Sequence, residues 1–261
     1  MHWDDLTREL DAWAAAQVPA TFWWRDDDAG DSGPALSQLF QCSSRHGVDL
    51  SLAVVPERVT ARLAEAVSLQ NRVAVLQHGH AHRNHAGTSG RAVELGGPRP
   101  ICTILDELRQ GLAKLIALFG SRFRPVLVPP WNRIDEPVVR YLPSGGYSGL
   151  SVFGPRANLE PVPGIIACNT HVDPLSWRGG PRFAGQGKVL KLFIEALQAR
   201  RSGTVDPAEP VGLLTHHLHH DAAAWDFLDH LLAVTASHPG TRWVSTDVSF
   251  ALPAPPSIPA G

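Results

Sequence analysis

Four histidines, His78, His80, His82 and His85, lie within eight residues of one another at the end of a short apolar run. Imidazole is the commonest protein ligand for zinc-like metals. His78 and His82 are four residues apart, and on one helical turn this spacing places both rings on the same face. A catalytic metal site needs about three protein ligands and an open position. The cluster therefore predicts part of a metal site, and the rest of the chain must supply the missing ligand.

Three consecutive aspartates, Asp26 to Asp28, come soon after the aromatic stretch 21–24. Carboxylates this close repel one another and raise each other's pKa values unless a cation lies among them. One interpretation is a solvated acidic loop or a helix cap, and the other is a packed site that holds a cation. Arg25 and the aromatic residues before it favour the packed site, and so does the histidine cluster.

The chain alternates short apolar runs with amphipathic segments of helical periodicity. Apolar runs of this length, separated by helices, are typical of a parallel sheet that is covered on both faces. We expect strands at 21–24, 48–55, 73–76, 125–128, 150–153, 164–168, 211–214 and 243–245. We expect helices at 4–17, 34–45, 56–69, 101–119, 136–142, 188–199 and 225–237. The sequence therefore predicts an α/β fold.

Polar clusters stand where the predicted strands end. They are Asp26 to Asp28, His78 to His82, Pro129 to Arg133, Asp173, and His216 with His217. In parallel α/β barrels and sheets the functional site lies at the carboxyl ends of the strands and is built from several loops. A single histidine at a strand end is more often a packed residue, but five clusters on separate strands together favour the site of a metal hydrolase.

Composition and charge limit the classes of partner that this protein can bind. The net charge is −2, so nothing in the charge balance favours nucleic acid or an anionic membrane. Cys42, Cys102 and Cys168 are far apart and form no CxxC pair, which argues against a disulfide framework or a cysteine-rich zinc site. The N-terminus lacks the pattern of a signal peptide, and no apolar run approaches the ~20 residues that span a bilayer. We expect a cytoplasmic protein with a single domain over residues 1–252 and a flexible Pro/Ala-rich tail at 253–261.

The strand-end clusters resemble the five motifs of the polysaccharide deacetylase (NodB-homology) family, which is carbohydrate esterase family four. The resemblance spans residues 21–217 and implies the family's fold, a distorted (β/α) barrel that is often seven-stranded. The first motif, Thr-Phe-Asp-Asp-Gly, resembles residues 25–29 and implies that Asp27 is the catalytic base and Asp28 a metal ligand. The triplet leaves a second register open, in which Asp26 is the base and Asp27 the ligand.

The second motif of the family is His-Ser/Thr-x-x-His. It resembles residues 78–82, which implies that His78 and His82 are the other two metal ligands. Gly79 stands where the family has a hydroxyl residue, so one local hydrogen bond is missing from the pattern.

The third motif, Arg-Pro-Pro-x-Gly, is similar to the stretch from Val128 to Asn132 and implies substrate contacts by Pro130, Trp131 and Asn132. Val128 stands where the family keeps an arginine that orients the base. Arg25 and Arg133 are both candidates for this guanidinium, since its fork of donors needs only to lie beside the carboxylate. A rival match, Phe123-Arg124-Pro125, leaves the double-proline turn unexplained.

The fourth and fifth motifs resemble segments further along the chain. An Asp followed by a Trp is similar to Asp173 and Trp177, which implies a place for both in substrate binding. Leu-x-His is similar to Leu214-Thr215-His216, which implies that His216 is the general acid, with Asp173 able to tune its pKa. The neighbouring His217 is an alternative.

The resemblance implies metal-dependent hydrolysis of an amide C–N bond, most simply the deacetylation of an N-acetylated sugar or oligosaccharide. Two imidazoles and one carboxylate suit Zn²⁺, with Co²⁺ and Ni²⁺ as alternatives. Two other functions stay open: an amidase of the same fold that acts on small linear amides, and a degenerate glycan-binding protein without catalysis. Among the tryptophans, Trp23 and Trp24 are expected in the core, whereas Trp131 and Trp177 are better placed to stack on a sugar.

Overall fold

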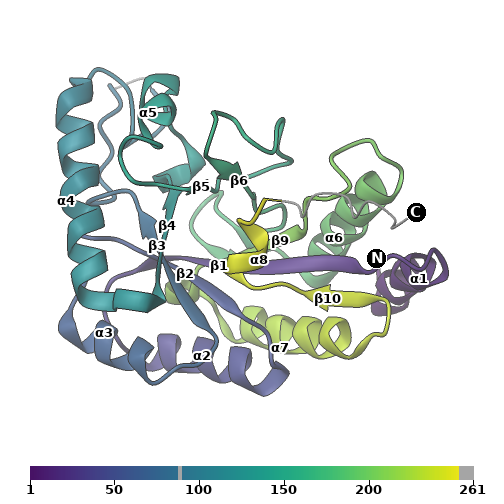
Figure 1. The fold of residues 1–261 in the computed structure, drawn as a ribbon. Coiled ribbons are helices and arrows are strands. Elements are labelled where there is room, and N and C mark those ends of the chain that lie inside the picture. Colours follow the sequence, from purple (N-terminus) through teal and green to yellow (C-terminus); the bar gives the residue numbers. More distant parts are fainter. Residues whose placement is uncertain (88–89, 253–261) are drawn as a thin grey trace, which may run out of the picture.

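The computed structural model describes residues 1–87 and 90–252 (Figure 1). Seven parallel strands form a curled sheet in the order β6, β5, β4, β3, β2, β1, β9. They are β1 (Ala20–Ala29), β2 (Leu50–Val54), β3 (Val73–His78), β4 (Phe123–Val128), β5 (Gly149–Leu150), β6 (Ile166–Ala167) and β9 (Val211–Thr215). An eighth strand, β10 (Thr241–Trp243), pairs with the first residues of β1. The predicted α/β fold with a distorted barrel is confirmed.

A short contact closes the barrel between β6 and β9. The segment that follows β6 forms one parallel bridge, Val172 with Leu213, and Leu214 N donates to the Val172 carbonyl over 2.8 Å. A Cβ on Gly212 would lie 2.4 Å from the Asn169 carbonyl oxygen, so only glycine admits this close approach of two backbones. The closure depends on backbone proximity at one point rather than on a full ladder.

Helices cover the outside of the sheet (Figure 1). They are α1 (Trp3–Ala15), α2 (Pro34–His46), α3 (Ala61–Ser68), α4 (Ile101–Phe119), α5 (Glu136–Tyr141), α6 (Gln186–Arg201), α7 (Ala222–Ser237) and α8 (Thr246–Ser249). Three single 3₁₀ turns are η1 (Gly120–Arg122), η2 (Pro130–Asn132) and η3 (His217–His219). Within the described ranges, no helix combines the length and the apolar character that crossing a membrane requires.

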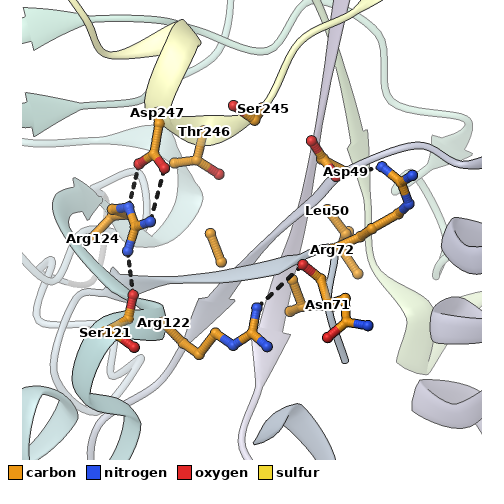
Figure 2. Close-up of a pocket in the computed structure, with 12 residues that line it drawn as sticks. Asp49, Leu50, Asn71, Arg72, Ser121, Arg122, Arg124, Ser245, Thr246 and Asp247 are labelled. Atoms are coloured by element: carbon orange, nitrogen blue, oxygen red, sulfur yellow. Dashed lines mark hydrogen bonds and ion pairs between the residues drawn. The ribbon is translucent and has the colours of Figure 1, made fainter. Parts of the chain in front are cut away.

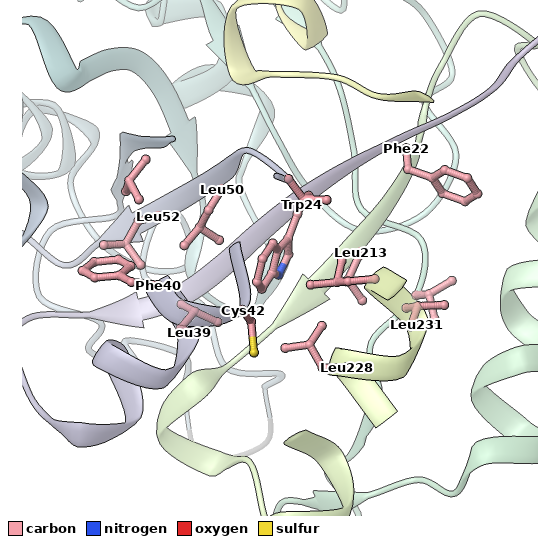
Figure 3. Close-up of a cluster of buried hydrophobic side chains, with 14 of the residues drawn as sticks. Phe22, Trp24, Leu39, Phe40, Cys42, Leu50, Leu52, Leu213, Leu228 and Leu231 are labelled. Carbon is pink, nitrogen blue, oxygen red and sulfur yellow. The ribbon is translucent and has the colours of Figure 1, made fainter. Parts of the chain in front are cut away.

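The main core lies between the sheet and the helices. Figure 3 shows Trp24 of β1 beside Leu39 and Cys42 of α2 and Leu228 of α7. Trp23 and Trp24 are both fully buried, as predicted, and neither ring reaches the surface. This packing fixes β1 firmly, and β1 carries the aspartate triplet.

Several element boundaries differ from the predictions. Strand β1 does not end before the aspartates but runs through them to Ala29, because β9 and β2 pair with it as far as Asp26 and Ala29 respectively. Helix α3 begins at Ala61 rather than at residue 56, because the Thr60 side chain accepts a hydrogen bond from Leu63 N and caps the helix there. Strands β5 and β6 are shorter than the predicted apolar runs. A small antiparallel pair, β7 (Leu175–Ser176) with β8 (Arg182–Phe183), was not predicted. The predicted tail at 253–261 lies outside the described residues.

Candidate functional site

Two histidines and one aspartate meet at the carboxyl ends of β1 and β3. Asp28 Oδ1 lies 3.2 Å from His78 Nε2 and 3.2 Å from His82 Nε2. One ligand atom of each residue lies within 4.8 Å of the others, so the three side chains form a group that could hold a metal ion. The sequence predicted this set of three, and the structure brings it together.

A bend in β1 explains how adjacent aspartates reach the same place. Neighbouring residues of a regular strand point to opposite faces. At Asp28 the backbone has φ +73°, and the register between β1 and β2 shifts between Asp26 and Ala29. Positive φ is uncommon outside glycine but is tolerated better by Asp and Asn. Because of this bulge, Asp27 and Asp28 both line one cavity.

Asp26 points away from that cavity. Its carboxylate accepts hydrogen bonds from Thr215 Oγ1 at 2.6 Å and from the backbone N–H of His217 at 3.0 Å, and it pairs with His217 Nδ1 at 2.5 Å. Burial alone would lower the pKa of His217, but the charge of Asp26 outweighs it and raises that pKa. The geometry thus favours the register in which Asp27 is the base and Asp28 is the ligand. His217 is occupied by its buried pair with Asp26.

Each histidine of the group is oriented by its own surroundings. His78 ends β3, and its Nδ1 lies 2.9 Å from the Val128 carbonyl oxygen, so Nδ1 carries the proton and Nε2 is free to bind a metal. His82 lies in a loop with φ +56°, and its ring centroid is 4.4 Å from that of Trp131. The expectation that both histidines share a helical turn is therefore wrong. Instead, His78 at the end of a strand and His82 in a left-handed loop conformation both point toward Asp28.

The group fits a divalent metal on three observations. Asp28 Oδ1 is buried and has no hydrogen-bond partner among the described residues. Two ligand atoms on a tetrahedral zinc ion, each about 2.0–2.1 Å from the metal, are about 3.3 Å apart. The two 3.2 Å separations from Asp28 Oδ1 match that spacing. Burial opposes ionisation of Asp28, but the His78 ring 3.2 Å away and the charge of His82 lower its pKa well below the usual value. Asp28 is therefore suited to be an anionic ligand.

Arg25 holds Asp27 in place. Arg25 Nε and Nη2 donate to the two oxygens of Asp27 at 2.9 and 3.0 Å, and both side chains are almost fully buried. The guanidinium also donates to Ser151 Oγ at 2.6 Å and to Asn132 Oδ1 at 2.7 Å. Arg133, the other candidate for this role, donates to the Ala92 carbonyl oxygen instead. Arg25 thus occupies the position that the missing arginine of the third motif implies.

The rival match at Arg124 lies at the other end of the barrel. A cleft of about 330 Å³ lies at the amino ends of β2, β3 and β4. Figure 2 shows Arg124 in this cleft, where it binds both oxygens of Asp247. Arg72 pairs with Asp49 in the same cleft. Arg124 is therefore remote from the aspartate triplet and does not orient the base.

His216 faces the metal group from the end of β9. Its Nδ1 lies 3.8 Å from Asp173 Oδ2, which is beyond hydrogen-bond distance, and has no partner in the described part of the chain. Trp177 Nε1 donates to Asp173 Oδ2 at 2.8 Å, and the Trp177 ring packs edge-on against His216 at 4.7 Å. Burial raises the pKa of Asp173, although the nearby His216 opposes this shift. The predicted members of the fourth and fifth motifs thus lie together.

One cavity of about 990 Å³ connects these groups. Of the predicted site residues, those on its wall are Asp27, Asp28, His78, His82, Trp131, Asn132, Arg133, Asp173, Trp177 and His216. Pro130 is not on the wall; it is the buried first residue of the turn that carries Trp131. Sequence reasoning assigned no role to Arg91, Phe153, Leu175, Lys188, Leu192 and His219, which also line the cavity. Phe153 ends a predicted strand, so its position was a usable signal; Arg91 and Lys188 carried none.

Comparison with solved structures identifies the fold. No protein-family model and no curated protein sequence matches the chain. A Mycobacterium smegmatis protein that is assigned as a polysaccharide deacetylase aligns with a TM-score of 0.59 and 16% identity, over 87% of each chain. The Bc1960 peptidoglycan N-acetylglucosamine deacetylase aligns with a TM-score of 0.53 and 14% identity, over 92% of this chain and 96% of its own. The fold is that of the carbohydrate esterase family four deacetylases.

That fold does not by itself establish catalysis. BA3943 of Bacillus anthracis, described as a CE4 family pseudoenzyme, aligns with a TM-score of 0.52 and 15% identity, over 89% of this chain and 66% of its own. The predicted resemblance is confirmed for the fold, and the residues in the cavity must carry any functional conclusion.

Proposed function

We propose that this protein is a metal-dependent hydrolase of amide C–N bonds that removes the acetyl group from an N-acetylated sugar. One observation carries the proposal: the carboxylate of Asp27, held by Arg25, lines the same cavity as the Asp28–His78–His82 group and His216. A base, a metal group and an acid around one cavity are the parts that amide hydrolysis requires.

Each group has one role in the proposed reaction. A divalent metal held by Asp28, His78 and His82 supplies Lewis acidity and lowers the pKa of water. Asp27 takes the proton from the attacking water, and the two hydrogen bonds from Arg25 keep both carboxylate oxygens in a fixed orientation. His216 donates a proton to the departing amine, which is otherwise a poor leaving group.

The shape of the cavity supports a sugar as the substrate. Trp177 and Phe153 are each 46% exposed and line the cavity, as does Trp131. Exposed aromatic rings present flat apolar faces that suit the apolar face of a pyranose. Among the similar structures, T48 deacetylase was solved with its substrate, and Bc1960 is named for N-acetylglucosamine in peptidoglycan. Zinc as the metal and a cytoplasmic location stay predictions from the sequence.

Two alternatives use the same cavity. A linear amidase would employ the same base, metal group and acid on a smaller substrate. A glycan-binding protein without catalysis has a precedent in the Bacillus anthracis pseudoenzyme. The intact pairing of Arg25 with Asp27 beside a complete ligand group favours catalysis over binding alone.

The test combines metal analysis with acetate release from N-acetylated chito-oligosaccharides. Asp28→Ala should lose both the bound metal and the activity, and retention of either refutes the assignment. Asp31→Ala is the matched control, since Asp31 lies three residues further on and, among the described residues, its carboxylate bonds only Thr60, Arg62 and Ser32. Metal without acetate release, together with amine release from small linear amides, would favour the amidase. Neither metal nor hydrolysis in the wild type would favour the binding protein.

A further inference from the structure

The loop between the two histidine ligands has no room for a side chain at its first residue. Gly79 has φ +54°, and a Cβ there would lie 2.0 Å from Glu94 Oε2 and 2.6 Å from Pro130 Cγ. The family pattern has a hydroxyl residue at this position. Here the carboxylate of Glu94, which lies further along the same connection between β3 and α4, fills the space instead.

Glu94 is fully buried and binds the backbone of that loop. Its Oε1 accepts hydrogen bonds from Ala81 N at 2.8 Å and Arg83 N at 3.2 Å, and its Oε2 accepts one from His80 N at 3.0 Å. Successive backbone N–H groups of this kind form a concavity that stabilises an anion.

This carboxylate has no cationic partner. No ion pair involves Glu94 within residues 1–87 and 90–252, and the remaining residues carry no basic side chain. A buried charge without a counter-ion must be stabilised by its hydrogen bonds. The three N–H groups of the histidine loop therefore supply that stabilisation, and in return the loop is held in one conformation.

Glu94 acts on the residues that flank a metal ligand. His82 lies between Ala81 and Arg83, the two residues bound to Oε1, and its own φ is +56°. A non-glycine residue in this conformation is strained and persists only when its surroundings determine it. We propose that Glu94 is the positioning residue of the metal group, which fixes the left-handed conformation that turns His82 Nε2 toward Asp28. This inference rests on the proposed function, because it assumes that the three residues bind a metal.

A second buried glutamate separates positioning from general stability. Glu209 is 1% exposed, and its carboxylate accepts hydrogen bonds from Arg156 N at 2.9 Å and Asn169 N at 2.8 Å. Like Glu94, it accepts hydrogen bonds from backbone N–H groups, but the segments that it binds carry no member of the Asp28–His78–His82 group. Glu209→Gln is the matched control for Glu94→Gln.

The experiment measures cobalt(II) affinity by competition with a chelator, the visible absorption of the bound cobalt, and urea unfolding of the metal-free proteins. Glu94→Gln should weaken cobalt affinity by roughly 10–100-fold and alter the absorption, as loss of an outer-sphere partner does. Glu94→Asp, which keeps the charge but is one methylene shorter, should also weaken affinity at least about tenfold. Glu209→Gln should destabilise the metal-free protein yet bind cobalt within about twofold of wild type.

Wild-type-like cobalt affinity in both Glu94 variants would overturn the inference, whatever their stability. If Glu94→Gln does not fold, the cobalt affinity of Glu94→Asp tests the inference in its place. A wild type that binds cobalt without releasing acetate would refute the deacetylase function while leaving the role of Glu94 testable by affinity. A wild type that binds no cobalt would overturn both.

Discussion

Arg25 and Arg133 were equal candidates for the guanidinium beside the base, and substitution separates them. Arg25→Gln would remove two charge-assisted hydrogen bonds from Asp27 and one each from Ser151 and Asn132. It would leave the Asp27 carboxylate buried without its counter-charge. We therefore expect a large loss of stability together with loss of the oriented base.

The magnitude follows from burial and distance. Opposite charges about 4 Å apart attract by about 4 kcal/mol at an effective dielectric constant of about 20. Breaking a buried pair by removing one partner costs about 3–5 kcal/mol in mutational studies. Both side chains here are at most 3% exposed, so solvent provides little compensation. We expect Arg25→Gln to lower the free energy of unfolding by about 3–5 kcal/mol.

Urea unfolding of Arg25→Gln, Asp27→Asn and the double variant provides the assay. The double variant should cost less than the sum of the single variants by about 1–3 kcal/mol, because the pair is lost only once. Arg133→Gln is the control, and it should cost no more than about 1.5 kcal/mol, since its guanidinium donates one hydrogen bond to the Ala92 carbonyl oxygen. Additivity within about 0.5 kcal/mol, or equal losses in Arg25→Gln and Arg133→Gln, would refute the reasoning.

Two further predictions concern stability outside the metal group. Burial lowers the pKa of His220 to about 4 despite the opposing charge of Asp26. The unfolded chain therefore binds a proton that the folded chain excludes, and stability present above pH ~6.5 is lost as the pH falls to ~4. His220→Phe keeps a ring against Trp225. Over that pH range, its free energy of unfolding should fall by about 3 kcal/mol less than that of the wild type. Parallel pH profiles of the two proteins would contradict this prediction. Gly212→Ala would place a methyl group 2.4 Å from the Asn169 carbonyl oxygen and should cost at least about 1–3 kcal/mol by urea unfolding. Gly87→Ala, whose added Cβ has no atom of the described residues within 4 Å, is its control and should stay within about 0.5 kcal/mol.

One part of the site was predictable from the sequence but was left open between two arginines. Arg25 and Asp27 are two residues apart on β1, and side chains at this spacing point to the same face of a strand. Had the strand been extended through the aspartates, the pair would have followed from periodicity alone. Strand propensity argues against a strand at three adjacent aspartates, because Asp is depleted in strands. Pairing with β9 and β2 overrides that preference.

Glu94 carried no signal in the sequence. It stands in the Gly- and Pro-containing stretch between the histidines and α4, where periodicity is absent. Its role depends on where the loop packs, and this is decided by contacts such as the bridge between Leu95 and Ile134. The absence of a hydroxyl residue at Gly79 was visible, but the sequence did not show what replaces it.

The sequence by itself determined which strand ends carry the chemistry. Apolar runs of strand length must be buried, and parallel connections bring their carboxyl ends to one side of the barrel, so the histidine pair, the aspartates and His216 had to converge. Only the tertiary structure decided which aspartate side chain lies beside the two histidines and which arginine forms the ion pair with the base. These outcomes depend on a bulge at Asp28 and on the exact path of one loop, and local propensity encodes neither.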